Sequence, residues 1–162
     1  VRPLTFNHKR RLCRDSRQLR GIRLYGWDDC LAACLWNKFA QTAPVSELRG
    51  RPEFTTPDLA YLARLSDAEF RTFCSRTAIK RIGRDRFVRN VMIALGNVGA
   101  ENAVMVAKER LEDESPLVRG AAVWALSRLL ETAAFEKLRQ KERAVELDPD
   151  VLKEWESGAA EI

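Results

Sequence analysis

Two stretches of the sequence resemble each other, and this internal similarity constrains the fold more than any other feature. FVRNVMIALGNVG at residues 87–99 is similar to LVRGAAVWALSRLL at residues 117–130. The pair Val-Arg recurs thirty residues later, and the pair Ala-Leu recurs thirty-one residues later. Each stretch reads as a helix and follows a helix or turn that can pair with it. This spacing indicates helical pairs that stack and bury a shared core.

A series of helices is predicted from residue 56 onward. Thr56-Pro57-Asp58 indicates a helix start with proline in the first turn, and the capping-box pattern from Ser66 to Glu69 indicates another. Further helices are predicted over residues 86–95, 102–111, 116–130 and 132–147. Strands have almost no support. The expected fold class is therefore all-α, with short helical repeats of the HEAT type.

Composition limits the class of protein. The chain has 162 residues, of which 46% are hydrophobic and 31% charged, as expected of one globular domain with or without a short appendage. Neither a bilayer-spanning apolar run nor a signal peptide is visible, so we expect a cytoplasmic protein without membrane contact. The four cysteines lack the spacing of a secreted disulfide framework, which agrees with a reducing compartment.

Positive charge is distributed unevenly along the chain, whose net charge is +5. Residues 1–23 contain eight arginines or lysines and one acid, whereas residues 142–162 are rich in acids. This asymmetry suggests one end that faces a polyanion and one that faces solvent. The alternative is an ordinary solvated surface.

A dense basic cluster lies in the stretch AIKRIGRDRFVRN. It consists of Lys80, Arg81, Arg84, Arg86 and Arg89. Guanidinium groups bind phosphate oxygens through two hydrogen bonds, and helix N-termini add further N–H donors. The cluster therefore predicts contact with phosphates or nucleic acid. The alternative is that some of these arginines form ion pairs with Asp67, Glu69 or Asp85.

The stretch YGWDDCLAACLWNK at residues 25–38 has the appearance of a metal-binding turn that lacks some ligands. Cys30 and Cys34 have the spacing of the last two cysteines in an iron–sulfur run, but two thiolates do not hold a four-iron cluster. Zinc needs the same number of ligands, and Cys13 and His8 are too distant in sequence to be counted before the structure is known. Buried free cysteines on an amphipathic turn are the alternative. No catalytic triad or glycine-rich phosphate loop is recognisable.

Several of these stretches together resemble one known family. RLYGWDDCLAACLWNKFAQ is similar to the second ferredoxin-like segment of epoxyqueuosine reductase, and AIKRIGRDRFVRNVMIALGN is similar to a later basic motif of that family. LVRGAAVWAL resembles the helical repeat that follows, and TFNHK resembles a stretch nearer the N-terminus. The resemblance extends from about residue 4 to about residue 130.

The family resemblance implies a tRNA-modifying enzyme that reduces epoxyqueuosine to queuosine. Its members have a cobalamin-binding catalytic domain, a ferredoxin-like part with two [4Fe–4S] clusters, and a helical-repeat domain that helps to hold the tRNA anticodon stem-loop. The resemblance covers only the C-terminal part of such an enzyme, so the cobalamin-binding domain is expected to be absent from this chain.

When the sequence is matched to the family position by position, the resemblance implies that Cys30 and Cys34 are residual iron–sulfur ligands. Trp27 stands where the family has a further cysteine, and Leu35 where it has a proline. An indole does not ligate iron, so the second iron–sulfur motif is degenerate. The resemblance also implies that the residues of the basic cluster bind nucleic acid, in agreement with the interpretation from charge alone.

The expected organisation has four parts. Residues 1–41 form a degenerate ferredoxin-like segment, residues 42–57 a linker, residues 58–150 a HEAT-like helical domain and residues 151–162 an acidic tail. The expected function is that of a C-terminal portion of epoxyqueuosine reductase that binds tRNA but is not catalytic alone, with a separate catalytic half as a further partner. The alternatives are a protein-interaction module and an electron-transfer subunit with one residual cluster.

Overall fold

The protein is described by a computed structural model that covers residue 12, residues 14–24, 34–39, 41 and 54, and residues 56–160. Every regular element within these residues is a helix, so the predicted all-α class is confirmed. The first elements are α1 (Arg14–Leu19) and the 3-10 helix η1 (Leu35–Phe39). The rest are α3 (Leu59–Arg64), α4 (Asp67–Phe73), η4 (Ala78–Ile82), α5 (Arg84–Val98), α6 (Ala103–Glu109), η5 (Arg110–Glu112), α7 (Pro116–Leu129), α8 (Thr132–Glu142) and α9 (Pro149–Ala160).

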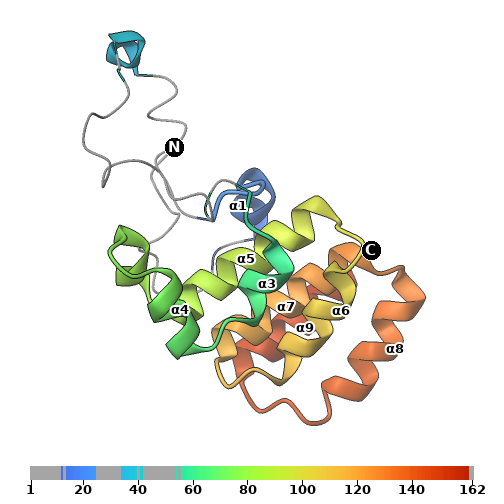
Figure 1. Cartoon of the computed structure of the whole chain (residues 1–162). Coiled ribbons are helices and arrows are strands. Elements are labelled where there is room, and N and C mark those ends of the chain that lie inside the picture. The colour runs from blue at the N-terminus through green and yellow to red at the C-terminus, as the bar shows by residue number, and fades with distance from the viewer. Residues whose placement is uncertain are drawn as a thin grey trace.

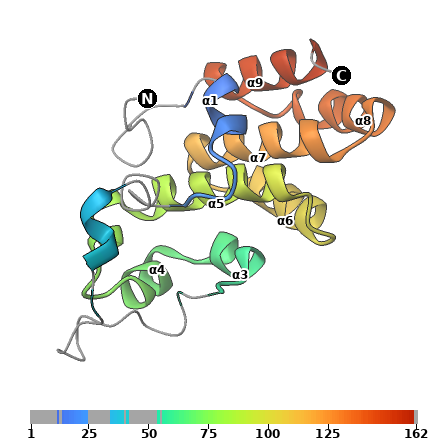
Figure 2. The same cartoon turned by 90° about the horizontal axis from the view of Figure 1, so that it is seen from above.

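Helices α5 and α7, which contain the two similar stretches, pack against each other at the centre of the molecule (Figure 1). Helices α3 and α4 contact α5, whereas α6 and α9 contact α7. Figure 2 shows the resulting order, from α3 and α4 through α5 and α7 to α9. The core between these helices contains fully buried apolar side chains, among them Leu62, Phe87, Val91, Trp124 and Trp155. The predicted stacking of helical pairs is therefore observed.

The starts of α3 and α4 follow from local capping chemistry. The predicted capping box is present, because the Glu69 N–H donates to Ser66 Oγ and the Ser66 N–H donates to the Glu69 carboxylate. Helix α3 begins at Leu59, later than predicted. Asp58 is its N-cap and accepts from the Ala60 N–H at 2.9 Å, so Pro57 precedes the cap instead of lying in the first turn.

Helix α5 is longer than the predicted 86–95 because Gly96 lies inside it. A Cβ at Gly96 would lie 2.9 Å from the Trp124 ring and 3.0 Å from the Ala125 Cα of α7. The glycine therefore allows the two helices to approach closely, and it is not a stop signal. The helix ends instead at Gly99, whose left-handed φ of 69° suits a residue without a side chain.

The C-terminal residues differ from the expected acidic tail. Residues 149–160 form helix α9, in which Val151 and Trp155 are buried against the core. Its start carries a clear signal, since Asp148 Oδ1 accepts from the N–H of Asp150 and of Val151 at 3.0 Å each, and Pro149 is the first helical residue. The acid-rich composition of these residues concealed the apolar pair Val151 and Trp155, which are about one helical turn apart. Helix α8 correspondingly ends at Glu142, short of the predicted residue 147.

Candidate nucleic-acid interface

The predicted basic cluster follows η4 and the first half of α5. Ile82 is buried and Ile79 packs against the core, which anchors η4 and leaves Lys80 and Arg81 exposed between them. Gly83 then turns the chain into α5 with a left-handed φ of 78°, a conformation that favours glycine. The apolar pattern of this short stretch therefore fixes which of its cations reach solvent.

Arg84 is held inside the fold by an acid that is distant in sequence. Its Nη1 and Nη2 donate to the two carboxylate oxygens of Asp113 at 2.8 and 2.6 Å, and its Nε donates to the Leu65 carbonyl at 3.0 Å. The side chain of Asp113 is 4% exposed, and that of Arg84 is 13% exposed. Every edge of the Arg84 guanidinium thus has a partner within the protein, and its role is to join α5 to the loop before α7.

This ion pair determines the protonation of both groups. Burial alone raises the pKa of Asp113, but the hydrogen bonds from Arg84 and the Ser115 N–H and the Arg84 charge together bring it below its ordinary 3.8. The same hydrogen bond raises the pKa of Arg84 against the opposing effect of burial. The pair is therefore fully charged at neutral pH.

We expect Arg84→Met to lower the free energy of unfolding by about 2 kcal/mol at pH 7, because it leaves the buried Asp113 carboxylate with only the weaker contacts from Arg110 and the Ser115 N–H. The native pKa of Asp113 is depressed, so the stabilisation is present above its ordinary value and is lost as pH falls through the native value. Urea unfolding measures the free energy of unfolding of both proteins at pH 7 and at about pH 2. The difference between the variant and the unsubstituted protein should be smaller at the lower pH.

The control for this substitution is Arg71→Met. Arg71 forms an ion pair with Asp67, but the two side chains are 63% and 58% exposed. An exposed pair of this kind contributes less than about 0.5 kcal/mol. Equal losses from the two substitutions would contradict the structural role given to Arg84.

Arg86 and Arg89 have different surroundings although both lie on α5. Arg86 is half-buried, and within the described residues it forms no hydrogen bond or ion pair. Arg89 is 2% exposed, and its Nε and Nη2 donate to Oδ1 of Asn90 at 3.1 and 2.9 Å. Burial, followed by the charges of Arg20, Arg86 and Arg17, lowers the pKa of Arg89 to about 10. Arg89 is thus an interior cation and not part of an exposed surface.

One exposed cation was missed by the sequence analysis. Arg76 lies in the turn between α4 and η4, is exposed, and forms no hydrogen bond or ion pair with the residues described. Its φ of 58° is left-handed, which is uncommon for a residue with a side chain and makes the turn a strained one. Its position four residues before Lys80 could have indicated that it belongs with the basic cluster. We refer to Arg76, Lys80, Arg81 and Arg86 as the basic surface.

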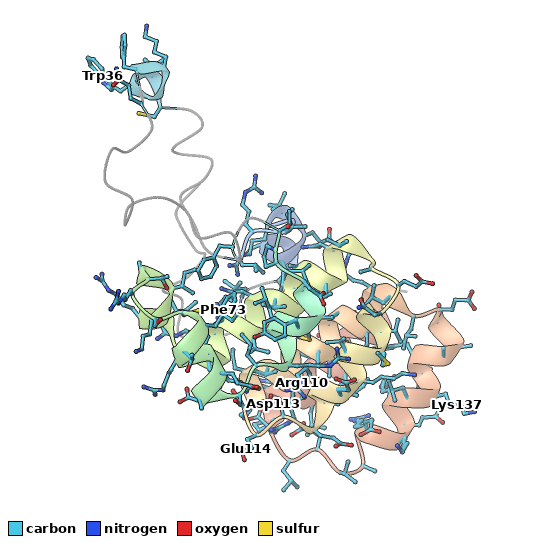
Figure 3. The ribbon with its side chains drawn as sticks, in the orientation of Figure 1. Trp36, Phe73, Arg110, Asp113, Glu114 and Lys137 are labelled. Carbon is cyan, nitrogen blue, oxygen red and sulfur yellow. The ribbon has the colours of Figure 1, made fainter. Side chains whose placement is uncertain are left out.

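An acidic hollow adjoins the basic surface. This cavity of about 750 Å³ is lined by residues of α4, α5, α6, η5 and the loop before α7, among them Asp85, Glu109, Glu112 and Glu114. Figure 3 shows Arg110, Asp113 and Glu114 close together at this place. The carboxylates repel phosphates, so they set one boundary of any polyanion site.

Of the two predicted iron–sulfur ligands, one lies among the described residues. Cys34 is an exposed free thiol beside η1, while Cys30, Cys13 and His8 lie outside the described residues. No group of three or more His, Cys, Asp or Glu side chains able to hold a metal is found among the residues described. A [4Fe–4S] cluster takes four thiolates, so this part of the chain does not by itself fit the group.

The fold and the sequence pattern define a helical-repeat protein of the HEAT type. A family model described as HEAT repeats matches residues 76–155, which include the two central helices. Among the residues described, no helix combines the length and the apolar character that crossing a membrane requires.

Comparison with known proteins shows which particular proteins the chain is similar to. The chain is 39% identical over 115 residues to epoxyqueuosine reductase of Salmonella typhimurium, and this alignment covers 71% of this chain and 30% of that protein. It is 36% identical over 125 residues to that of Xanthomonas campestris pv. campestris, covering 76% of this chain and 35% of that protein. The fold matches a crystal structure of epoxyqueuosine reductase with a tRNA-Tyr epoxyqueuosine-modified stem loop, with a TM-score of 0.84 and 29% identity, over 92% of this chain and 40% of that chain.

The chain is thus a homologue of the C-terminal part of epoxyqueuosine reductase, and the resemblance noted in the sequence is confirmed. It spans about a third of the length of the curated relatives it matches.

Proposed function

We propose that this chain binds the anticodon stem-loop of a tRNA through the basic surface. Lys80 and Arg81 carry the proposal, because both are exposed while the apolar residues beside them anchor η4 to the core. The relative that was crystallised with a tRNA stem loop supports the choice of RNA as the polyanion. Arg76 and Arg86 extend the same surface to either side of η4.

The chemistry of RNA suits such a surface. An A-form stem presents phosphates and 2′-hydroxyl groups along its shallow groove, so proteins recognise it mainly by shape and backbone contacts. Guanidinium and ammonium groups on a rigid helical support supply these contacts, and they release counterions when they bind. Binding by a few cations alone is expected to be weak and strongly dependent on salt.

In this proposal the chain contributes RNA binding to an epoxyqueuosine reductase. Reduction of epoxyqueuosine in tRNA would require the cobalamin-binding domain of the family as a separate catalytic half, and the enzyme would act in the cytoplasm. Of the iron–sulfur ligands implied by the resemblance, Cys34 is described and exposed. No catalytic step is assigned to the present residues.

The double substitution Lys80→Ala/Arg81→Ala is expected to weaken binding of an anticodon stem-loop by about 50-fold in 0.1 M salt, because it removes two phosphate contacts. The slope of log affinity against log salt should become less steep by about 2. Fluorescence anisotropy with a labelled stem-loop over a range of salt concentrations measures both quantities.

The matched control is Lys137→Ala/Lys141→Ala. Both lysines are exposed on α8 and the change in net charge is the same. Figure 3 shows Lys137 on the opposite side of the molecule from α4. If the control weakens binding as much as the substitutions on η4, net charge and not the basic surface governs RNA binding, and the proposal fails.

A further inference from the structure

Another hollow adjoins both the basic surface and the acidic hollow, since it shares Arg86 with the first and Asp85 with the second. This cavity of about 430 Å³ is lined by residues of α4, η4, the start of α5 and α7, and it is large enough for a planar organic ring. Ile82 and Leu117 contribute apolar side chains. Gly83 contributes none, and a Cβ there would meet no atom of the described residues within 4 Å apart from its chain neighbours, so open space lies over its backbone. We refer to this cavity as the Gly83 hollow.

The charged side chains that line the Gly83 hollow balance one another. Arg84 and Arg86 carry two positive charges, and Asp67 and Asp85 carry two negative ones. Asp67 is in addition paired with Arg71, whose Nε donates to its Oδ2. A lining without net charge gives a phosphate group no electrostatic advantage over a neutral polar group. The hollow therefore suits a neutral ligand with polar edges, whereas the basic surface beside it suits phosphates.

Asp85 has an acceptor available to a ligand in this hollow. Its side chain is 55% exposed, and its Oδ1 lies 3.5 Å from Nη1 of Arg84. Its Oδ2 accepts no hydrogen bond from the residues that the structure describes. A carboxylate oxygen accepts but does not donate, so it selects an N–H or O–H donor. Adenine, cytosine and guanine carry an exocyclic amine that supplies such a donor, whereas uracil has a carbonyl oxygen where cytosine has its amine.

Arg86 is placed to hold the phosphate next to such a base. It lines the Gly83 hollow, is half-buried, and has no hydrogen bond or ion pair within the described part of the chain. Its guanidinium therefore keeps its donors for a ligand. Because Arg86 belongs to both the hollow and the basic surface, a nucleotide whose phosphate contacts Arg86 can direct its base over Gly83 toward Asp85.

We propose that the Gly83 hollow receives an unpaired, amino-bearing base from the loop of the bound stem-loop, and that the amine of this base donates to the Asp85 carboxylate. The inference rests on the proposed RNA binding and adds a base preference to it. Phosphate contacts position a nucleic acid, whereas contacts with base edges specify its sequence. Unpaired loop bases can leave the stack, so their edges are open to such contacts. A uracil placed in the same way turns a carbonyl oxygen toward the carboxylate and is disfavoured.

The first test compares stem-loops that share one stem and whose loops contain uridine only, or uridine with a single cytidine placed at each loop position in turn. Fluorescence anisotropy in about 0.1 M salt should show about 5-fold tighter binding for one cytidine position, because a hydrogen bond to a charged acceptor replaces a repulsive contact. Asp85→Ala should remove this preference. Loss of the negative charge strengthens binding of all loops alike, so the ratio of affinities is the quantity to compare. Equal affinities for all loops in the unsubstituted protein, or a preference that survives in Asp85→Ala, overturns the inference.

The second test blocks the Gly83 hollow without changing its charge. Leu117→Trp places a larger side chain in the lining and should also remove the preference for cytidine, while far-ultraviolet circular dichroism checks that the variant is folded. The control is Leu147→Trp, at a residue that is 91% exposed and does not line the hollow, and it should retain the preference. A preference that persists in folded Leu117→Trp contradicts the place given to the base.

Lys80→Ala/Arg81→Ala separates this inference from the proposed function. The double substitution should weaken binding of the uridine and cytidine loops by the same factor and keep their ratio. If the loops bind through Lys80 and Arg81 but with equal affinity, the base site is wrong and the proposed RNA surface stands. If neither loop depends on Lys80 and Arg81, the proposed function fails, and the inference fails with it.

Discussion

We expect Glu154→Ala to lower the free energy of unfolding by about 4 kcal/mol, because it removes the partner of a buried cation. The side chains of Arg17 and Glu154 are 5% and 10% exposed, and they join α1 to α9 across 137 positions of sequence. Without Glu154, the Arg17 guanidinium keeps its Nε bond to the Leu12 carbonyl and its contact with the Trp124 ring, and it lies near the positive charge of Arg89. An unpaired buried charge next to another of like sign is among the costliest changes available in this fold.

Urea unfolding measures this loss, and a double substitution tests its cause. If the cost of Glu154→Ala comes from leaving Arg17 unpaired, then Arg17→Met/Glu154→Leu should lie within about 1 kcal/mol of the unsubstituted protein, since both charges are replaced by apolar groups. A double variant that is less stable than Glu154→Ala would show instead that the side chains act mainly through packing.

The central helices were predictable from the sequence because their information is local. The similarity between the stretches that contain Val88-Arg89 and Val118-Arg119 specifies a repeated helical face, and such faces must pack on each other to bury it. The match to HEAT repeats bears this out. Helix α9 was missed because its acids dominated the composition, although Asp148-Pro149 and the pair Val151 and Trp155 together indicate a capped amphipathic helix.

The basic cluster was only partly predictable, because sequence shows where cations are and not what they contact. Arg84 is neutralised by Asp113, 29 residues later, and the Asn90 amide contacts Arg20, 70 residues earlier. The alternative of local ion pairs also applies in part, since Arg84 Nη1 lies 3.5 Å from Asp85. Pairings over such distances depend on how the helices stack, which no local pattern specifies. The exposure of Lys80 and Arg81, by contrast, follows from their apolar neighbours.

We expect Trp124→Ala to lower the free energy of unfolding by about 4 kcal/mol. Trp124 is fully buried at the contact between α5 and α7, where the absence of a side chain at Gly96 makes room for its ring. The guanidinium carbons of Arg17 and Arg128 lie 5.7 and 5.5 Å from the ring centroid, so the substitution removes two cation–π contacts as well as apolar contact area. The helices on either side are fixed by other contacts, so they cannot close the cavity fully.

The matched control is the same substitution at Trp36 on η1, a residue that is 78% exposed. Trp36→Ala removes a ring contact with Phe39, at 5.9 Å between centroids, and is expected to change stability by less than about 0.5 kcal/mol. Urea unfolding followed by far-ultraviolet circular dichroism compares the two variants without relying on tryptophan fluorescence. Similar losses in both would mean that the stability of the fold does not depend on close packing between α5 and α7, and the central place given to that contact would be wrong.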